Sequence, residues 1–180
     1  MDFRIAPQPA EFAWLSPRGP PNAKTRTAAA TFQGKKVVVQ TPPCTTRLFK
    51  DNNTTLYLDL PSDESPYAEF AAWIESFETY ASQNISTGDA APSPAVRNGS
   101  LRLMVWDDAQ YFDADGTFLK EAPSAISKCV LLIEFGGLWV TDRSWGLKWR
   151  VTQVQVLESA PQAKSGGGGA PKFGGYAFSS

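Results

Sequence analysis

The chain has 180 residues, 42% of them hydrophobic, and a net charge of −1, which fits one domain with its own core plus tails. No stretch approaches the roughly 18 consecutive apolar residues of a membrane-spanning helix, so we expect no membrane partner. Histidine is absent and the only cysteines are Cys44 and Cys129, which excludes a structural zinc site and a disulfide framework. We therefore expect no metal and no cofactor, and the lack of a secretory signal predicts an intracellular protein.

The charges are unevenly distributed along the chain. Residues 35–50 contain cations and no acid, whereas residues 51–83 contain acids and no cation. A basic face can therefore exist on a protein of near-zero net charge, because the local field matters more than the total. Ordinary fluctuation in a short chain explains the pattern equally well.

The first third of the chain predicts an arm followed by strands. Residues 1–30 are rich in Pro and Ala and are expected to form an irregular arm. Residues 31–41 read as a strand that stops at a Pro-Pro pair, and residues 45–50 as a short extended piece or a loop. Residues 54–60 alternate Leu with polar residues, which is typical of a strand buried on one face.

One helix is expected at about residues 62–82, where the hydrophobic period changes. Ser65 is a suitable N-cap, Pro66 fits the first helical position and Glu69 favours the first turn. Four apolar residues at helical spacing predict the face that packs on the core: Phe70, Ile74, Phe77 and Ala81.

Residues 101–106 alternate again and predict a strand with Leu101, Leu103 and Val105 on its inner face. The segment 113–116 (DADG) that follows contains two acids but lacks the rest of a calcium-binding loop, so we expect a plain Asp-Gly turn of a small hairpin.

Residues 127–158 predict a long β-hairpin with a short polar tip. The pair Gly136-Gly137 interrupts the first arm and indicates a bulge, and the apolar phase slips near Thr152-Gln153, as in a bulged strand. Trp149 shares a face with Leu147 and Val151, so we expect it in the core.

Tryptophans and cations are interleaved in this hairpin, an arrangement suited to stacking bases and pairing with phosphates of a single strand. The alternative interpretation is that the tryptophans are core and the cations a solvated face. Residues 159–180 are rich in Gly, Ala and Ser and are expected to form a flexible tail. Three aromatic residues in that tail are candidates for binding a protein partner: Phe173, Tyr176 and Phe178.

The order of elements predicts a mainly β fold, a five-stranded Greek-key barrel of the oligonucleotide-binding type with one inserted helix, spanning residues 31–158 between two disordered tails. A β-sandwich or an α+β sheet fits the pattern nearly as well. No paired carboxylate, nucleophile–base pair or phosphate loop is found in the sequence, so we expect a protein that is not an enzyme.

Several motifs resemble a known family. They are residues 40–43 (QTPP), 56–60 (LYLDL), 101–105 (LRLMV), 137–140 (GLWV) and 145–156 (WGLKWRVTQVQV). Together they resemble the single-stranded DNA-binding proteins of short-tailed phages and their relatives in large DNA viruses of algae and amoebae. The resemblance covers about residues 32–157 at the level of pattern.

The resemblance implies a barrel that binds single-stranded DNA during viral replication and recombination, at the replication site inside the host cell. It allows a homodimer and a tail that recruits replication proteins, although the acidic tail of the phage proteins is not matched here. The second hypothesis is a virion or assembly protein that uses the barrel as an interaction surface. The residues expected to contact nucleic acid are Lys35, Lys36, Arg47, Phe49, Lys50, Arg102, Tyr111, Trp139, Arg143, Trp145, Lys148 and Arg150.

Overall fold

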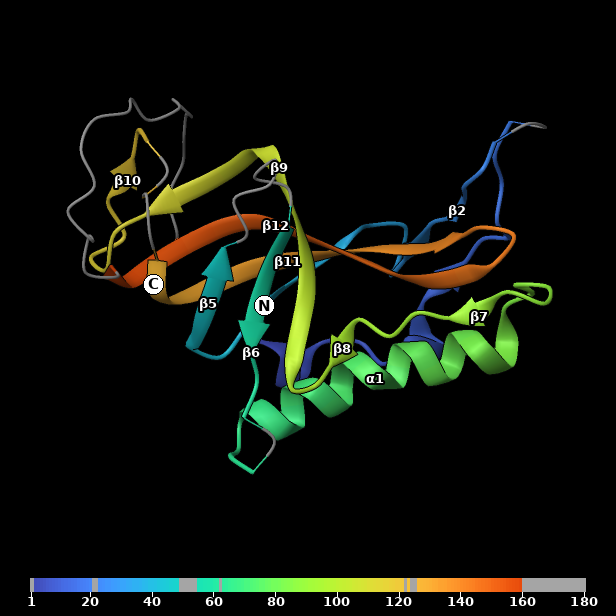
Figure 1. The fold of residues 1–180 in the computed structure, drawn as a ribbon, viewed down its shortest axis with the longest axis horizontal. Helices are drawn as coiled ribbons and strands as arrows, with labels where there is room; N and C mark the ends of the chain where they lie inside the picture. Colours follow the sequence, from blue (N-terminus) through green and yellow to red (C-terminus); the bar gives the residue numbers. More distant parts are fainter. Residues whose placement is uncertain are drawn as a thin grey trace.

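The computed structural model describes residues 2–20, 23–48, 55–61, 63–121, 123 and 126–159, with side chains for all of these except 47, 48 and 159. Figure 1 shows a curved, mainly β molecule with one helix below a long hairpin.

Five strands close into a barrel, as the element order predicted. They are β5 (Cys44–Leu48), β6 (Thr55–Asp59), β9 (Ser100–Phe112), β11 (Ile126–Val140) and β12 (Ser144–Ser159). The order of the strands around the barrel is β9, β6, β5, β11 and β12, and a parallel pairing of β12 with β9 completes the ring. Each of the five strands is therefore paired with two others of the ring among the described residues.

The alternating pattern of β6 and β9 decides which side chains face inward. Leu101, Leu103 and Val105 are buried, whereas Arg102, Met104 and Trp106 project outward. Strand β9 is longer than expected, because it continues through the acidic pair at 107–108 to the predicted hairpin turn before β10 (Phe118–Leu119).

Both interruptions predicted in the long hairpin are present. The pairing register of β11 and β12 shifts between Phe135 and Leu138, at the two glycines, and again where Thr152 bulges opposite Leu132 and Ile133. Gly137 has φ +92, and a Cβ there would lie 1.9 Å from the carbonyl oxygen of Ala28. Only glycine therefore allows β2 (Arg26–Ala28) to pair with β11 at this bulge.

The N-terminal segment, expected to be irregular, contains short regular elements. These are η1 (Phe3–Ile5), η2 (Pro9–Glu11), β1 (Ala13–Trp14), β2 and β3 (Ala30–Thr31). Phe3 and Phe12 are both 6% exposed and belong to the core. Widely spaced aromatic residues thus anchor a segment whose local sequence has no period. The remaining short strands are β4 (Val37–Gln40), β7 (Ala91–Pro92) and β8 (Val96–Arg97).

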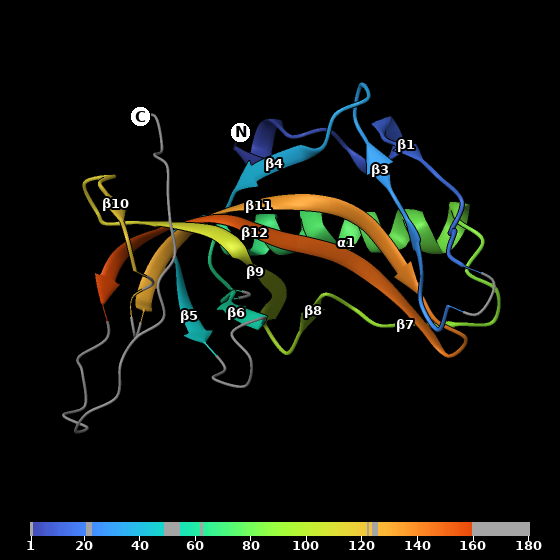
Figure 2. The same cartoon turned by 90° about the horizontal axis from the view of Figure 1, so that it is seen from above.

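The helix α1 spans Tyr67–Asn84, so it begins later than the expected residue 62. Pro66 is the N-cap and not the first helical residue, and Ser65 makes no capping bond; its hydroxyl instead hydrogen-bonds the Glu69 carboxylate. The predicted apolar stripe is buried. Seen from above, α1 runs along the length of the hairpin (Figure 2).

The core is aromatic where the helix meets the hairpin. The ring centroids of Phe135 and Trp149 lie 4.6 Å apart, and Phe77 of α1 lies 4.7 Å from Phe135. Phe12 adds an edge-on contact to Phe77 at 5.2 Å. Offset and edge-to-face contacts of this kind stabilise a core beyond the area they bury.

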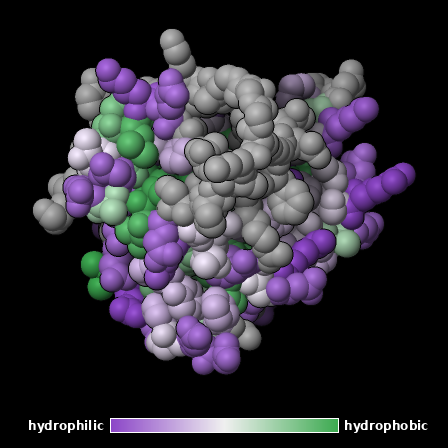
Figure 3. All heavy atoms as spheres, turned by 60° about the vertical axis from the view of Figure 1, so that its left-hand side comes forward, coloured by the Kyte–Doolittle hydropathy of each residue, from purple (hydrophilic) through white to green (hydrophobic). Residues whose placement is uncertain are grey.

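The surface at the β10 end of the molecule intersperses hydrophilic and hydrophobic side chains (Figure 3). Within the described part of the chain, no helix has the length and apolar character needed to cross a membrane.

Candidate nucleic-acid interface

The outward side of β6, β9 and β12 forms one continuous face. Tyr57 is paired with Arg102 across β6 and β9, and Met104 is paired with Arg150 across β9 and β12. Directly paired residues share a face of a sheet, so these side chains lie together outside the barrel. Leu101, Leu103 and Val105 fill the interior, and this fixes the outward direction of Arg102 and Met104 between them.

A groove of about 900 Å³ crosses this face. Three parts of the chain line it: the barrel face, the end of the long hairpin with the adjoining β2, and the β7–β8 segment, residues 91–98. The lining residues are Thr25, Thr27, Tyr57, Ser93, Pro94, Ala95, Arg97, Asn98, Ser100, Arg102, Met104, Trp139, Thr141, Leu147, Lys148 and Trp149. The groove therefore combines aromatic surface with hydroxyl and amide groups.

The described lining carries three cations, Arg97, Arg102 and Lys148, and no carboxylate. Asp59 lies at its margin, where its carboxylate accepts a 3.0 Å hydrogen bond from Ser100 Oγ. A concave surface that carries cations and no carboxylate attracts an anionic ligand more strongly than the net charge of −1 suggests.

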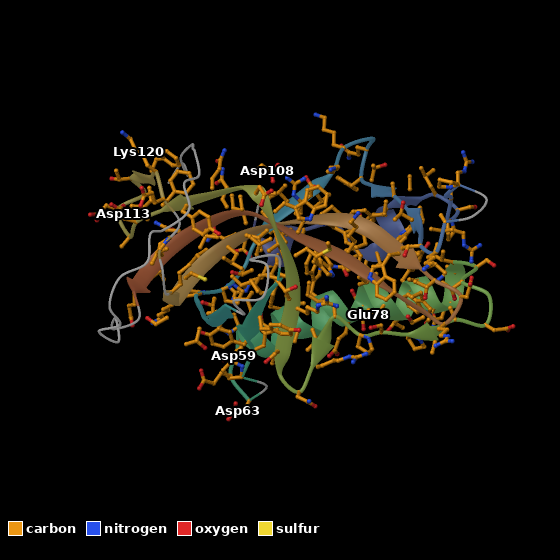
Figure 4. All side chains as sticks on the ribbon, turned by 45° about the horizontal axis from the view of Figure 1, so that its top comes forward. Asp59, Asp63, Glu78, Asp108, Asp113 and Lys120 are labelled. Carbon is orange, nitrogen blue, oxygen red and sulfur yellow. The ribbon has the colours of Figure 1, made fainter. Side chains whose placement is uncertain are left out.

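An exposed tryptophan flanks the groove. Trp106 is 42% exposed, with the guanidinium carbon of Arg150 over its ring at 4.2 Å from the centroid and Lys148 Nζ at 5.6 Å. Arg150 is also ion-paired with Asp108, which Figure 4 labels on β9. An aromatic ring supported by two cations offers a stacking surface next to positive charge.

The helix holds one wall of the groove in place. The Ala95 backbone N–H donates to the Glu78 carboxylate of α1, and the Arg102 N–H donates to the Ala95 carbonyl oxygen at 2.9 Å. Burial raises the pKa of Glu78, partly offset by the hydrogen bond from Ala95. The β7–β8 segment is thus tied to α1 on one side and to β9 on the other.

Of the residues expected to bind nucleic acid, the structure brings Arg102, Trp139 and Lys148 into the groove. Arg150 lies beside them against Trp106, and Arg143 is exposed in the hairpin turn, where its carbonyl oxygen accepts a hydrogen bond from Ala91.

Other expected residues lie elsewhere. Lys36 is ion-paired with Glu134 at 2.7 Å. The Lys35 backbone forms two hydrogen bonds with the Phe32 backbone in a tight turn. Neither residue lines the groove. Trp145 is 3% exposed, so its ring is not open to a base in this structure. Tyr111 is partly buried, which raises its pKa, and it does not line the groove.

The side chain of Arg47 and all of Phe49 and Lys50 lie outside the described residues. The same holds for the three aromatic residues of the tail: Phe173, Tyr176 and Phe178.

The sequence interpretation missed Trp106, Tyr57 and Arg97. The signal for Trp106 and Tyr57 was available, because each alternates with buried leucines or valine and must therefore point outward. Arg97 belongs to a two-residue strand after a loop, and nothing in its local sequence indicates that it faces the barrel.

The described residues include no group of three or more side chains that could hold a metal ion. Cys44 and Cys129 are paired across β5 and β11 and are both buried. Burial raises the pKa of each thiol to about 12, so neither forms a reactive thiolate near neutral pH.

No protein-family model and no curated protein sequence matches this chain. Among solved structures, it is similar to the crystal structure of gp2.5, a single-stranded DNA-binding protein encoded by bacteriophage T7. The alignment covers 73% of this chain and 98% of gp2.5, with 12% sequence identity and a TM-score of 0.47.

Proposed function

We propose that this protein binds single-stranded DNA without sequence preference and without catalysing a reaction. The observation that carries the proposal is the groove of about 900 Å³ with three cations, no described carboxylate and exposed aromatic surface at its side. Cations along a groove can pair with a phosphate backbone, while Trp106, Trp139 and Tyr57 offer rings to unpaired bases. Stacking on rings tolerates every base, because each base has a π-face.

Duplex DNA suits this surface less well. Bases within a duplex are already stacked and paired, so they cannot reach rings that lie along a groove beside the β7–β8 segment. The proposal includes a role in the replication and recombination of viral DNA, which the sequence resemblance alone supports.

The test is a fluorescence titration with oligo-dT and with a duplex of equal length. Binding of the single strand should quench tryptophan emission, since Trp106 and Trp139 would stack on bases, and duplex should bind more weakly. Equal affinity for both, or unchanged emission in excess oligo-dT, would overturn the proposal.

A matched pair of variants locates the site. Arg102→Ala/Lys148→Ala removes two groove cations and should lower the affinity about tenfold or more, because two phosphate contacts are lost. Lys120→Ala/Lys128→Ala removes the same charge at the β10 end and the start of β11, and should change the affinity less than about twofold. Equal losses would place the binding surface outside the groove.

A further inference from the structure

Arg18, an exposed cation that precedes the barrel strands in the sequence, lies on the face of the sheet that carries the groove. The backbone of Arg18 forms two hydrogen bonds with Thr27 of β2, from Arg18 N–H to the Thr27 oxygen at 2.9 Å and back at 3.0 Å. Thr27 is paired with Trp139 of β11, and Trp139 with Gly146 of β12. Because directly opposed residues of antiparallel strands share a face, these four residues form one row across the ribbon.

The row faces the groove. Thr27 and Trp139 both line it, and a Cβ on Gly146 would lie 2.9 Å from Cζ2 of Trp139. The ring of Trp139 therefore passes over Gly146 on the groove side of the sheet, and Arg18 stands at the outer end of the same row. Figure 1 shows β2 running beside the end of the long hairpin.

The guanidinium of Arg18 is available to a ligand. Arg18 is exposed, and no described carboxylate forms an ion pair with it. A free guanidinium beside a partly exposed indole offers one charge for a phosphate and one ring for its base.

The next arginine of the same ribbon points the other way. Arg26 is paired with Val140, which is 1% exposed, and it alternates with Thr25 and Thr27, which line the groove. Successive residues of a strand point to opposite faces, so Arg26 lies on the face away from the groove although it too is exposed.

We infer that Arg18 is a phosphate-binding residue, and that the N-terminal segment extends the groove past Trp139 for a longer single strand. This inference rests on the proposed function and adds a residue and a segment to its site. The strand would run from Trp106 and Lys148 across Trp139 to Arg18, so an oligonucleotide too short to reach Arg18 would not gain from it.

The test compares Arg18→Ala with Arg26→Ala, using oligo-dT of about 5 and about 15 nucleotides. Arg18→Ala should weaken binding of the longer oligonucleotide about threefold to tenfold and reduce its salt slope by about 0.7, the value for one phosphate contact. The shorter oligonucleotide should be unaffected. Arg18→Lys should keep most of the affinity, which a purely structural role of the arginine would not require.

Arg26→Ala is the control and should bind both lengths like the unaltered protein. Equal effects of Arg18→Ala and Arg26→Ala, or an equal loss for short and long oligonucleotides, would overturn this inference while leaving the groove intact. If the unaltered protein binds no oligo-dT, the proposed function itself fails.

Discussion

Trp149 shows how one residue serves the core while its neighbours serve the surface. It is 2% exposed, and its ring centroid lies 4.6 Å from Phe135 and 5.5 Å from Phe77. Lys148 and Arg150, on either side of it in β12, point to the outer face beside Trp106. Alternation along β12 thus places a core residue between two surface residues.

Replacing Trp149 should therefore affect stability. Trp149→Ala is expected to lower the free energy of unfolding by about 3–5 kcal/mol, through lost contacts and a cavity. Trp149→Phe should cost clearly less, because it keeps an aromatic ring and removes an indole N–H that has no hydrogen-bond partner among the described residues. Urea unfolding of both variants checks this, with Lys148→Ala as the control that should stay near the unaltered value. Similar losses for the two Trp149 variants would contradict the argument.

Glu78 predicts a pH dependence of stability. Burial raises the pKa of its carboxyl in the folded protein above the ordinary value of 4.5. The folded state then binds a proton more tightly than the unfolded state, so stability rises as the pH falls through the raised pKa towards 4.5. Above the raised value, the buried charge lowers stability.

Glu78→Gln should remove this contribution while keeping an oxygen that can accept the hydrogen bond from Ala95. The melting temperature of the unaltered protein should rise relative to that of the variant as the pH falls from about 7 to about 5. A relative fall over the same range would show that the Ala95 hydrogen bond to the charged carboxylate outweighs its burial.

At the scale of elements, the long hairpin organises the molecule. Its strand β11 pairs with β12 on one edge and with β5, β4 and β2 on the other. The inner face of the hairpin carries Phe135, which packs against Phe77 of α1. The bulge at Gly136 and Gly137 separates the part that pairs with β4 from the part that pairs with β2. The bulge therefore marks the point beyond which the end of the hairpin extends past the barrel and lines the groove.

The two glycines of this bulge should differ in their tolerance of a side chain. Gly137→Ala should destabilise the protein by about 2–4 kcal/mol, since its φ is positive and its Cβ would collide with the Ala28 backbone. Gly136→Ala should cost less than about 1 kcal/mol, because its Cβ would lie 3.4 Å from the Lys148 carbonyl oxygen, an ordinary contact. Thermal unfolding of the two variants distinguishes them, and equal melting temperatures would mean that β2 shifts freely.

At the scale of the whole molecule, the distribution of charge matters more than its sum. The net charge is −1, yet the described groove lining holds three cations without a carboxylate. Asp108 and Glu134 are drawn into ion pairs with Arg150 and Lys36 outside the lining. The described lining therefore carries positive charge although the chain as a whole is weakly acidic.

This distribution predicts a strong dependence of binding on salt. If the three lining cations each contact a phosphate, the logarithm of the association constant for oligo-dT should fall with the logarithm of salt concentration with a slope of about −2 or steeper. Titrations at several NaCl concentrations measure the slope, and Arg102→Ala/Lys148→Ala should reduce its size by about 1.4. A slope near zero would mean that stacking alone holds the strand.

The sequence by itself determined the elements whose period is strong. Alternation identified β6, β9 and the two arms of the hairpin, the helical stripe identified α1, and the glycine pair and the slip near Thr152 located both bulges. It also assigned Trp149 to the core. These features depend on neighbours two to four positions apart, so the local pattern contains the information.

Only the tertiary structure decided which outward residues meet. Arg102, Lys148 and Trp139 come together because β9 pairs in parallel with β12, and β2 brings Thr27 beside Trp139. Lys35 is a cation like Arg102 and Lys148, but it lies in a turn outside the groove lining. The N-terminal segment became ordered through the distant contacts of Phe3 and Phe12, which no local period predicts. Pairing across long sequence separations is set by burial of the whole core. This is the physical reason that the local pattern located the strands and the interleaved tryptophans and cations, while only the fold brought Arg102, Lys148 and Trp139 to one groove.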